Sequence, residues 1–181
     1  VESKDGDTMR HIGPSRSKGM APHYLALNRN KRSIVIDLRQ SSGMEVLKRL
    51  LRNADVFLSN LRPASMARLG LGYEDVSAIN PRILYCGAYG FGERGPYAGK
   101  PAFDDLIQGA VGLPHLVERV TGQPYFLPTN MCDRTTALTA VYAITSALYA
   151  REKTGRGQFI EVPMFETMAQ YVLSDHLYGN I

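Results

Sequence analysis

The hydrophobic pattern of this chain alternates between short apolar runs and longer stretches with helical spacing. Four apolar runs predict strands, at residues 33–38, 55–59, 82–89 and 159–163. Helical stripes and stop signals predict helices, at residues 41–53, 63–68, 73–79, 104–111, 134–152 and 165–178. Two further stretches are less regular, 112–123 as irregular or partly helical chain and 124–128 as a short edge strand. Because strands and helices alternate, we expect an α/β fold.

The first two apolar runs are separated by a single predicted helix. A strand, a helix and a strand within about 27 residues form a βαβ crossover, so residues 33–38 and 55–59 should be parallel strands. The first run reads SIVIDL, and its nearly continuous apolar core is typical of a strand that is buried on both faces.

The helix at residues 134–152 is apolar on nearly every side, which predicts a buried helix. The sequence KTGRGQ ends it, with Gly155 or Gly157 free to take the left-handed conformation of a helix terminus. A polar loop delivers Asp133 to the start of this helix. A carboxylate in that place fits an N-cap, and it also fits a nucleophile held by the helix behind it. The residues alone leave both interpretations open.

Composition excludes several classes of protein. The 181 residues are 44% apolar and 21% charged, which suits a single domain with its own core. No apolar run is long enough for a membrane span, and no secretory signal is visible. Cys86 and Cys132 are too few for a disulfide framework. We therefore expect a cytoplasmic protein in a reducing setting, without a membrane partner or a redox cofactor.

The charge and motif content favours a small anionic ligand. The net charge of +4 suits such a ligand at least as well as nucleic acid, and no basic–aromatic patch indicates nucleic-acid binding. No CxxC pair suggests zinc, and no metal is expected. The glycine-rich residues 90–101 are able to cradle an anion with backbone N–H groups, but they have neither a GK[ST] ending nor a GxGxxG motif. Residues 60–62 directly follow a predicted strand, where open parallel sheets bind ligands.

Three segments in this order resemble one family closely. They read NRNKRSIVIDLR, ADVFLSNLRPASMARLGLGYEDVSAINPRILYCGAYGFGERGPY and AREKTGRGQFIEVPMFE. Together they resemble the class III CoA-transferases (CaiB/BaiF type), which include formyl-CoA and carnitine CoA-transferases and the α-methylacyl-CoA racemases. The resemblance implies an open, mostly parallel Rossmann-like sheet with helices on both faces. It also implies that residues 1–181 are part of the large CoA-binding domain of a longer protein, without the first βα unit and the C-terminal small domain. Such proteins form interlocked homodimers.

The resemblance also implies a role for individual residues. Asp133 matches the catalytic aspartate, which attacks the acyl-CoA thioester, passes through a mixed anhydride and an aspartyl-CoA thioester, and delivers CoA to a free carboxylic acid. Seven residues match or adjoin positions that line the CoA site: Arg39, Asn60, Leu61, Arg62, Arg68, Lys100 and Phe103. Cations suit the CoA phosphates. Without the resemblance, each cation would read as a solvated surface charge and Asn60 as a turn former.

The sequence departs from the family pattern at several positions. Phe103 stands where many transferases carry tyrosine and the racemases a catalytic histidine, and phenylalanine cannot transfer a proton. His115 does not match that position, and it reads as a loop or surface residue. Cys132 adjoins Asp133 but has no identifiable base, so it reads as a small packed residue. Ala64 replaces a common glycine, and Lys4 lies near a position where some members carry an arginine.

The leading prediction is therefore a CoA-transferase with Asp133 as nucleophile. Its substrates would be an acyl-CoA donor and a carboxylic acid acceptor, with coenzyme A as the group transferred. Two alternatives stay open at this stage. One is an acyl-CoA racemase or epimerase of the same family, and the other is a CoA-binding fragment without catalysis.

Overall fold

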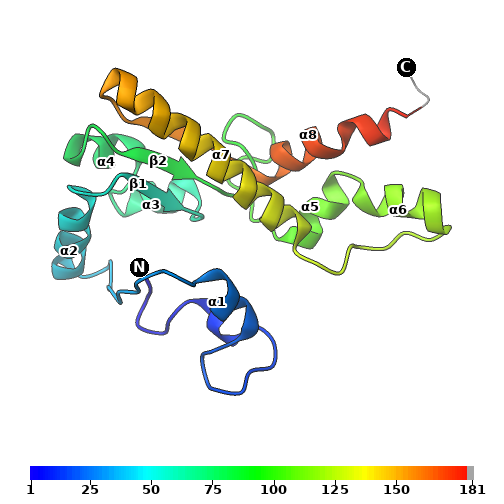
Figure 1. Cartoon of the computed structure of the whole chain (residues 1–181), viewed down its shortest axis with the longest axis horizontal. Coiled ribbons are helices and arrows are strands. Elements are labelled where there is room, and N and C mark those ends of the chain that lie inside the picture. Colours follow the sequence, from blue (N-terminus) through cyan, green and yellow to red (C-terminus); the bar gives the residue numbers. More distant parts are fainter. Residues whose placement is uncertain (179–181) are drawn as a thin grey trace. The chain divides into compact units, whose positions relative to one another are not determined.

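The computed structural model describes residues 1–178 and divides into two compact units, Val1–Leu50 and Leu51–Ile181 (Figure 1). The first unit holds η1 (Thr8–His11), α1 (Pro22–Leu27) and most of α2 (Ser41–Leu51). Its loops are tied together by Glu2, whose carboxylate accepts hydrogen bonds from the Arg10 guanidinium at 2.6 Å and from Ser33. The bond to Arg10 is the largest of several that hold the pKa of Glu2 well below its usual range.

The strand expected at residues 33–38 is wrong for this structure. The segment forms only one isolated parallel bridge, between Val35 and Glu2, and Val35 is 61% exposed. A strand that is buried on both faces needs elements packed over both faces, and a strand needs paired neighbours to belong to a sheet. Within residues 1–178 it has a single bridge partner, so the expected crossover between 33–38 and 55–59 does not form.

The second unit is built on a parallel sheet of β1 (Val56–Ser59), β2 (Leu84–Gly87) and β3 (Gln158–Glu161) in that order. These three strands confirm the runs expected at 55–59, 82–89 and 159–163, although each is shorter. The sequence order of parallel strands requires a crossover between each pair. The first crossover contains α3 (Pro63–Arg68) and α4 (Tyr73–Ile79).

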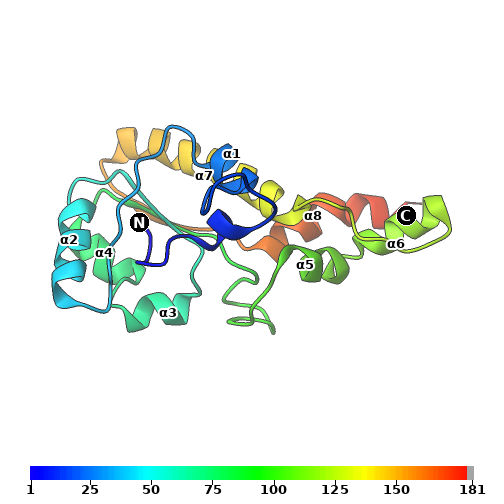
Figure 2. The same ribbon diagram turned by 90° about the horizontal axis from the view of Figure 1, so that it is seen from below.

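The two faces of the sheet are covered by different helices. Leu84, Cys86 and Ile160 pack with alanines of α7 (Met131–Thr154) on one face. On the other face the ring of Tyr85 contacts those of Phe57, Phe159 and Tyr73, the last from α4. Figure 2 shows α7 on one side of the strands and α3 and α4 on the other. The expected α/β fold with helices on both faces of a parallel sheet is therefore confirmed.

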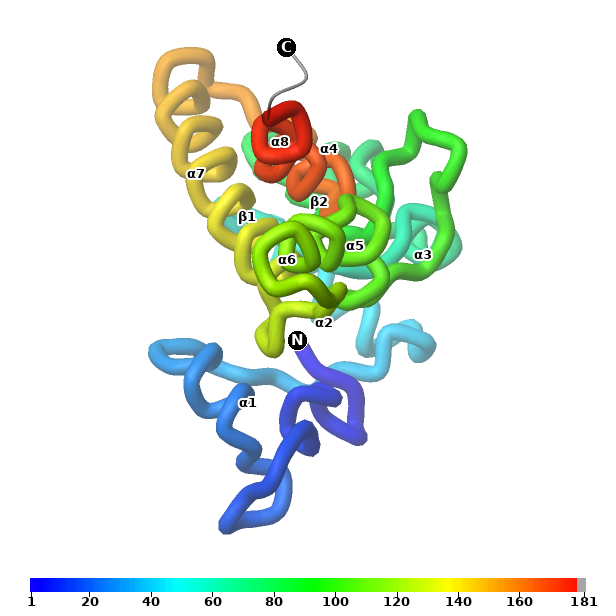
Figure 3. The backbone as a smooth tube through the Cα atoms, turned by 90° about the vertical axis from the view of Figure 1, so that its right-hand side faces the viewer, coloured from blue at the N-terminus to red at the C-terminus, as the bar shows by residue number. Residues whose placement is uncertain are grey.

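A second cluster joins α5 (Asp104–Ala110), α6 (Leu113–Thr121) and α8 (Met164–His176), which lie side by side in Figure 3. Its buried members include Ile107, Cys132 and Met168. Residues 112–123 are thus largely a helix. The edge strand expected at 124–128 is wrong, because these residues form irregular chain.

Helix α7 differs from the buried helix that its sequence suggested. Ala140 and Ala147 pack on the sheet, but Leu138 is 69% exposed on another side. Among the described residues nothing covers that side. The helix is therefore buried on one face only, although apolar residues occur on nearly every side of it. At its end, Gly155 takes the left-handed conformation with φ of 71°. Gly157 instead allows close backbone contact, since a Cβ there would collide with the Ile83 carbonyl. In the part of the chain that the structure describes, no helix is both long and apolar enough to cross a bilayer.

Arg151 fixes the last turns of α7 to the start of the sheet. Its buried guanidinium donates hydrogen bonds to the carbonyl oxygens of Asp55 and Arg82 at 3.3 and 3.1 Å, and to the Asp55 carboxylate at 2.8 Å. The Asp55 side chain is largely exposed, so the ion pair itself contributes little. The hydrogen bonds to the two carbonyl oxygens contribute more to stability, because a buried polar group that loses its hydrogen-bond partner costs about 1–3 kcal/mol.

We predict that Arg151→Met lowers the free energy of unfolding by about 2–3 kcal/mol. Methionine fills the space but removes the hydrogen bonds to both carbonyl oxygens, and the Asp55 carbonyl keeps the N–H of Leu84 as a donor. Urea denaturation measures the change. The control is Lys153→Met on the same helix, whose ammonium lies 5.3 Å from the Tyr149 ring centre and should matter by less than about 0.5 kcal/mol. Equal effects of the two substitutions would contradict the role given to Arg151.

Candidate active site

Asp133 lies in the first turn of α7 but does not cap it. The N-cap residue is Asn130, and its side chain makes no capping hydrogen bond. The carboxylate of Asp133 forms no hydrogen bond or ion pair with any residue of the described range 1–178. The N-cap interpretation is therefore excluded, and the carboxylate is free to meet a ligand at the positive end of a long helix.

The main chain of Asp133 is held from α5. Its N–H donates to Asp104 Oδ2 at 2.9 Å. Asp104 thus provides the acceptor that a capping side chain would provide for an unpaired N–H of the first helical turn. Partial burial, and in second place the negative charge of Asp104, raise the pKa of Asp133. The Asp133 side chain nevertheless stays accessible to solvent. The helix dipole acts in the opposite sense, because it favours the charged form.

Cys132 is not a rival nucleophile. It is fully buried beside α5 and α8, and burial, followed by the charges of Asp104 and Asp133, raises the pKa of its thiol to about 12. A buried thiol that stays protonated is inert at neutral pH. The expectation that Cys132 is a packed residue is confirmed.

A second group of predicted residues gathers around the carboxyl end of β1. Asn60, Leu61 and Arg62 follow the strand directly, and Arg62 Nη1 donates to the carbonyl oxygen of Gly99 at 3.3 Å. Lys100 follows that glycine, with Nζ 4.4 Å from the Tyr97 ring centre. Arg62 therefore contacts the loop that carries Lys100, although the two residues are 38 positions apart in sequence.

The other three predicted residues, Arg68, Phe103 and Arg39, lie on other elements. Arg68 lies on α3, where Nη2 donates to Ser65 Oγ at 3.0 Å. Phe103 precedes α5 as its N-cap residue and is 76% exposed, next to Asp104. Arg39 belongs to the first unit, where it forms an ion pair with Asp37 at 3.0 Å.

The glycine-rich loop at residues 90–101 binds carboxylates of this chain. The N–H of Gly92 donates to Glu166 at 3.0 Å, and the N–H of Glu93 donates to Glu161 Oε1, also at 3.0 Å. Glu161 accepts a further hydrogen bond from the Tyr89 hydroxyl at 2.6 Å. These two N–H groups are therefore occupied and do not form the anion cradle that the sequence suggested. Glu161 and Glu166 instead fix the loop that carries Lys100.

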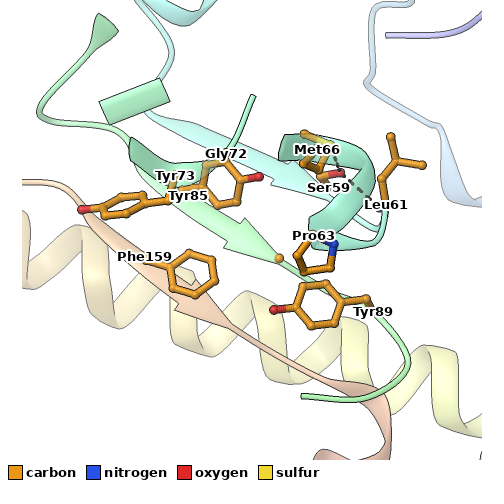
Figure 4. Close-up of a pocket in the computed structure, with 10 residues that line it drawn as sticks. Ser59, Leu61, Pro63, Met66, Gly72, Tyr73, Tyr85, Tyr89 and Phe159 are labelled. Atoms are coloured by element: carbon orange, nitrogen blue, oxygen red, sulfur yellow. Dashed lines mark hydrogen bonds between the residues drawn. The ribbon is translucent and has the colours of Figure 1, made fainter. Parts of the chain in front are cut away.

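An apolar cavity of about 110 Å³ adjoins the end of β1. Figure 4 shows aromatic rings of Tyr73, Tyr85, Tyr89 and Phe159 around it. Sequence reasoning missed this cavity, although tyrosines at alternate positions 85 and 89 across Gly87 are a signal for one lined face of a strand. Among residues 1–178, no three His, Cys, Asp or Glu side chains lie close enough together to hold a metal ion.

We predict that Asp104→Asn lowers the pKa of Asp133. Asparagine can keep the acceptor for the Asp133 N–H while removing a neighbouring negative charge, so the carboxylate ionises more readily. The part of the shift that comes from burial should stay. Titration of the Asp133 carboxyl carbon by NMR measures the change.

The matched control for this titration is Asp105→Asn, which removes the same charge from an exposed neighbour on α5. It should leave the pKa of Asp133 nearly unchanged. An Asp133 pKa that stays constant or rises in Asp104→Asn would show that Asp104 is not a source of the shift.

Comparison with known proteins identifies a family and several relatives. The sequence model of the family described as CoA-transferase family III matches residues 1–179. An acyl-CoA transferase from Fusarium pseudograminearum is 38% identical over 90% of this chain and 37% of that protein. Succinyl-CoA:glutarate CoA-transferase from Homo sapiens is 33% identical over 97% of this chain and 41% of that protein. The chain thus spans less than half the length of these curated relatives.

Solved structures agree with these relatives. The crystal structure of a CAIB/BAIF family protein from Brucella suis superposes with a TM-score of 0.92 at 36% sequence identity. The match covers 99% of this chain and 50% of the Brucella chain.

Proposed function

Since this chain belongs to CoA-transferase family III, we propose that it carries the nucleophile and part of the CoA site of an enzyme that moves CoA from an acyl-CoA to a free carboxylic acid. The observation that carries the proposal is the Asp133 carboxylate, free of partners among the described residues at the start of α7, with its main chain held by Asp104. Relatives named for succinyl-CoA, glutarate and oxalate support small carboxylic acids as substrates.

The proposed chemistry begins with attack of an Asp133 oxygen on the thioester carbonyl. The C–S bond breaks, CoA thiolate leaves, and a mixed anhydride links Asp133 to the donor acyl group. The thiolate then attacks the aspartyl carbonyl, which releases the donor carboxylate and leaves an aspartyl-CoA thioester. The acceptor carboxylate attacks this thioester, a second anhydride forms, and the thiolate takes the acceptor acyl group. Asp133 is regenerated, and no step requires a net proton.

The cations near the end of β1 fit the other end of the substrate. Arg62, Arg68 and Lys100 would bind the phosphates of CoA through charge-assisted hydrogen bonds. Asn60 and the half-exposed Leu61 would contact the adenine or pantetheine portion. Arg39, in the first unit, would be a further cation for these phosphates. Phe103, next to Asp104, would contribute apolar contact at the acyl end.

Two other proposals concern the whole protein. We propose that residues 1–181 form part of a large domain in a longer chain, and that the longer protein is a homodimer. The exposed apolar side chains of α7, which include Leu138, Val141 and Tyr142, support a covering segment from elsewhere. So does the edge of β1 that has no partner strand within residues 1–178.

The racemase alternative has no observation in its favour. Racemisation needs a second acid or base that exchanges a proton with the α-carbon of the acyl group, and the Phe103 side chain cannot transfer a proton. A CoA-binding fragment without catalysis is the alternative that an experiment must separate from the transferase.

We predict that incubation with a panel of acyl-CoAs produces a covalent adduct on this protein. Intact mass spectrometry should show a gain equal to the acyl or the CoA group, and hydroxylamine should remove it because anhydrides and thioesters are reactive acyl groups. Asp133→Ala should abolish the adduct, whereas the control Asp105→Ala should keep it. CoA binding without any adduct in both the chain and the full-length protein would support the non-catalytic alternative.

A further inference from the structure

Gln108 is a buried polar residue that the proposed chemistry does not use directly. It is 2% exposed, in the middle of α5. Its Oε1 accepts a hydrogen bond from the N–H of Leu127 at 2.9 Å. Its Nε2 faces the carbonyl oxygens of Leu127 and Thr129, each at 3.3 Å. The amide therefore binds the backbone of the loop that leads into α7 from both its donor and acceptor ends.

The same amide also holds Asp104. Gln108 Nε2 donates to Asp104 Oδ1 at 2.7 Å, and Asp104 Oδ2 accepts the main-chain N–H of Asp133 at 2.9 Å. The N–H of Leu127 fixes which end of the amide is oxygen, because a reversed side chain would place two donors together. Both oxygens of the Asp104 carboxylate are thus engaged, one by Gln108 and one by the nucleophile's backbone.

The first turn of α7 depends on these contacts for its place. Asn130 supplies no side-chain cap, and the residues before it form no strand or helix. A helix start without a capping side chain, entered from irregular chain, holds a catalytic group accurately when neighbouring side chains bind it. Gln108 binds this chain on one side of Asn130, and Asp104 binds it on the other. The two ties together restrict the position of the Asp133 carboxylate.

We propose that Gln108 is the positioning residue for Asp133, acting through residues 127–129 and through the Asp104 carboxylate. This inference rests on the proposed function, because it assigns Gln108 a role in the attack of Asp133 on the thioester. Gln108 itself touches neither substrate nor reacting atoms. Its effect should appear in the rate of the chemical steps and not in CoA binding, since the cations near β1 lie on other elements.

The test uses the full-length protein with Gln108→Met, which keeps the length of the side chain and removes all its hydrogen bonds. A displacement of about 1 Å at a catalytic group costs on the order of 100-fold in rate, so we expect kcat to fall about 10- to 100-fold. The KM for acyl-CoA should change by less than about twofold, because the effect is on the chemical step alone. The rate of adduct formation at Asp133 in a single turnover should fall with kcat.

The matched control is Thr136→Val, which removes a buried hydrogen bond in the first turns of α7, from Thr136 Oγ1 to the Cys132 carbonyl at 2.7 Å. It should leave kcat within about twofold. If Gln108→Met does not fold, Gln108→Asn replaces it. Asparagine keeps both amide groups on a side chain one methylene shorter, and it should give a smaller loss of the same kind.

The possible results distinguish the role of Gln108 from the proposed transferase function on which it rests. Absence of any Asp133 adduct in the wild-type protein overturns the proposed transferase, and the role of Gln108 with it. A wild-type adduct together with unchanged kcat in Gln108→Met, or with a raised KM and normal kcat, overturns the positioning role alone. A fall in kcat that Thr136→Val reproduces at equal thermal stability would also overturn it, because the loss would then be structural.

Discussion

The packing of α7 along one face of the parallel sheet is the constraint on which the rest of the second unit depends. Ala140 and Ala147 let the helix lie close to Cys86 and Ile160, and Arg151 fixes its last turns to the start of two strands. A helix of 24 residues transmits that alignment over about 36 Å. These contacts set the direction of the helix, and Gln108 and Asp104 fix the position of its first turn, which carries Asp133.

The charge on Asp133 is shaped by opposing influences. The positive end of α7 favours the carboxylate, whereas partial burial and the nearby Asp104 raise its pKa. A raised pKa makes the carboxylate oxygen more basic, and basicity favours attack on a thioester carbonyl. Asp104 thus has two effects, since it binds the main chain of Asp133 and also repels its charge. Gln108, buried behind Asp104, binds one oxygen of the Asp104 carboxylate and so holds it in this place.

Local sequence pattern predicted the elements that local interactions determine. The runs that became β1, β2 and β3 and the long helix before Gly155 follow from apolar spacing and a glycine terminus. The apolar spacing at 33–38 is equally strong, but spacing does not identify a pairing partner, and this segment has only the bridge to Glu2. Asp133, Arg62 and Lys100 were found through family motifs, but which of them lie together needed the fold. Gln108 gave only a weak signal, as a polar residue four positions after Asp104 on an otherwise apolar helix face.

The most direct measurement is the transfer of ¹⁸O from a labelled acceptor acid to the protein. Each turnover through an aspartyl anhydride leaves one acceptor oxygen on the nucleophile, because the thiolate attacks the acceptor carbonyl and expels the aspartate. After many turnovers, peptide mass spectrometry should find ¹⁸O in the side chain of Asp133 and in no other residue. CoA transfer that proceeds while Asp133 stays unlabelled would contradict the account.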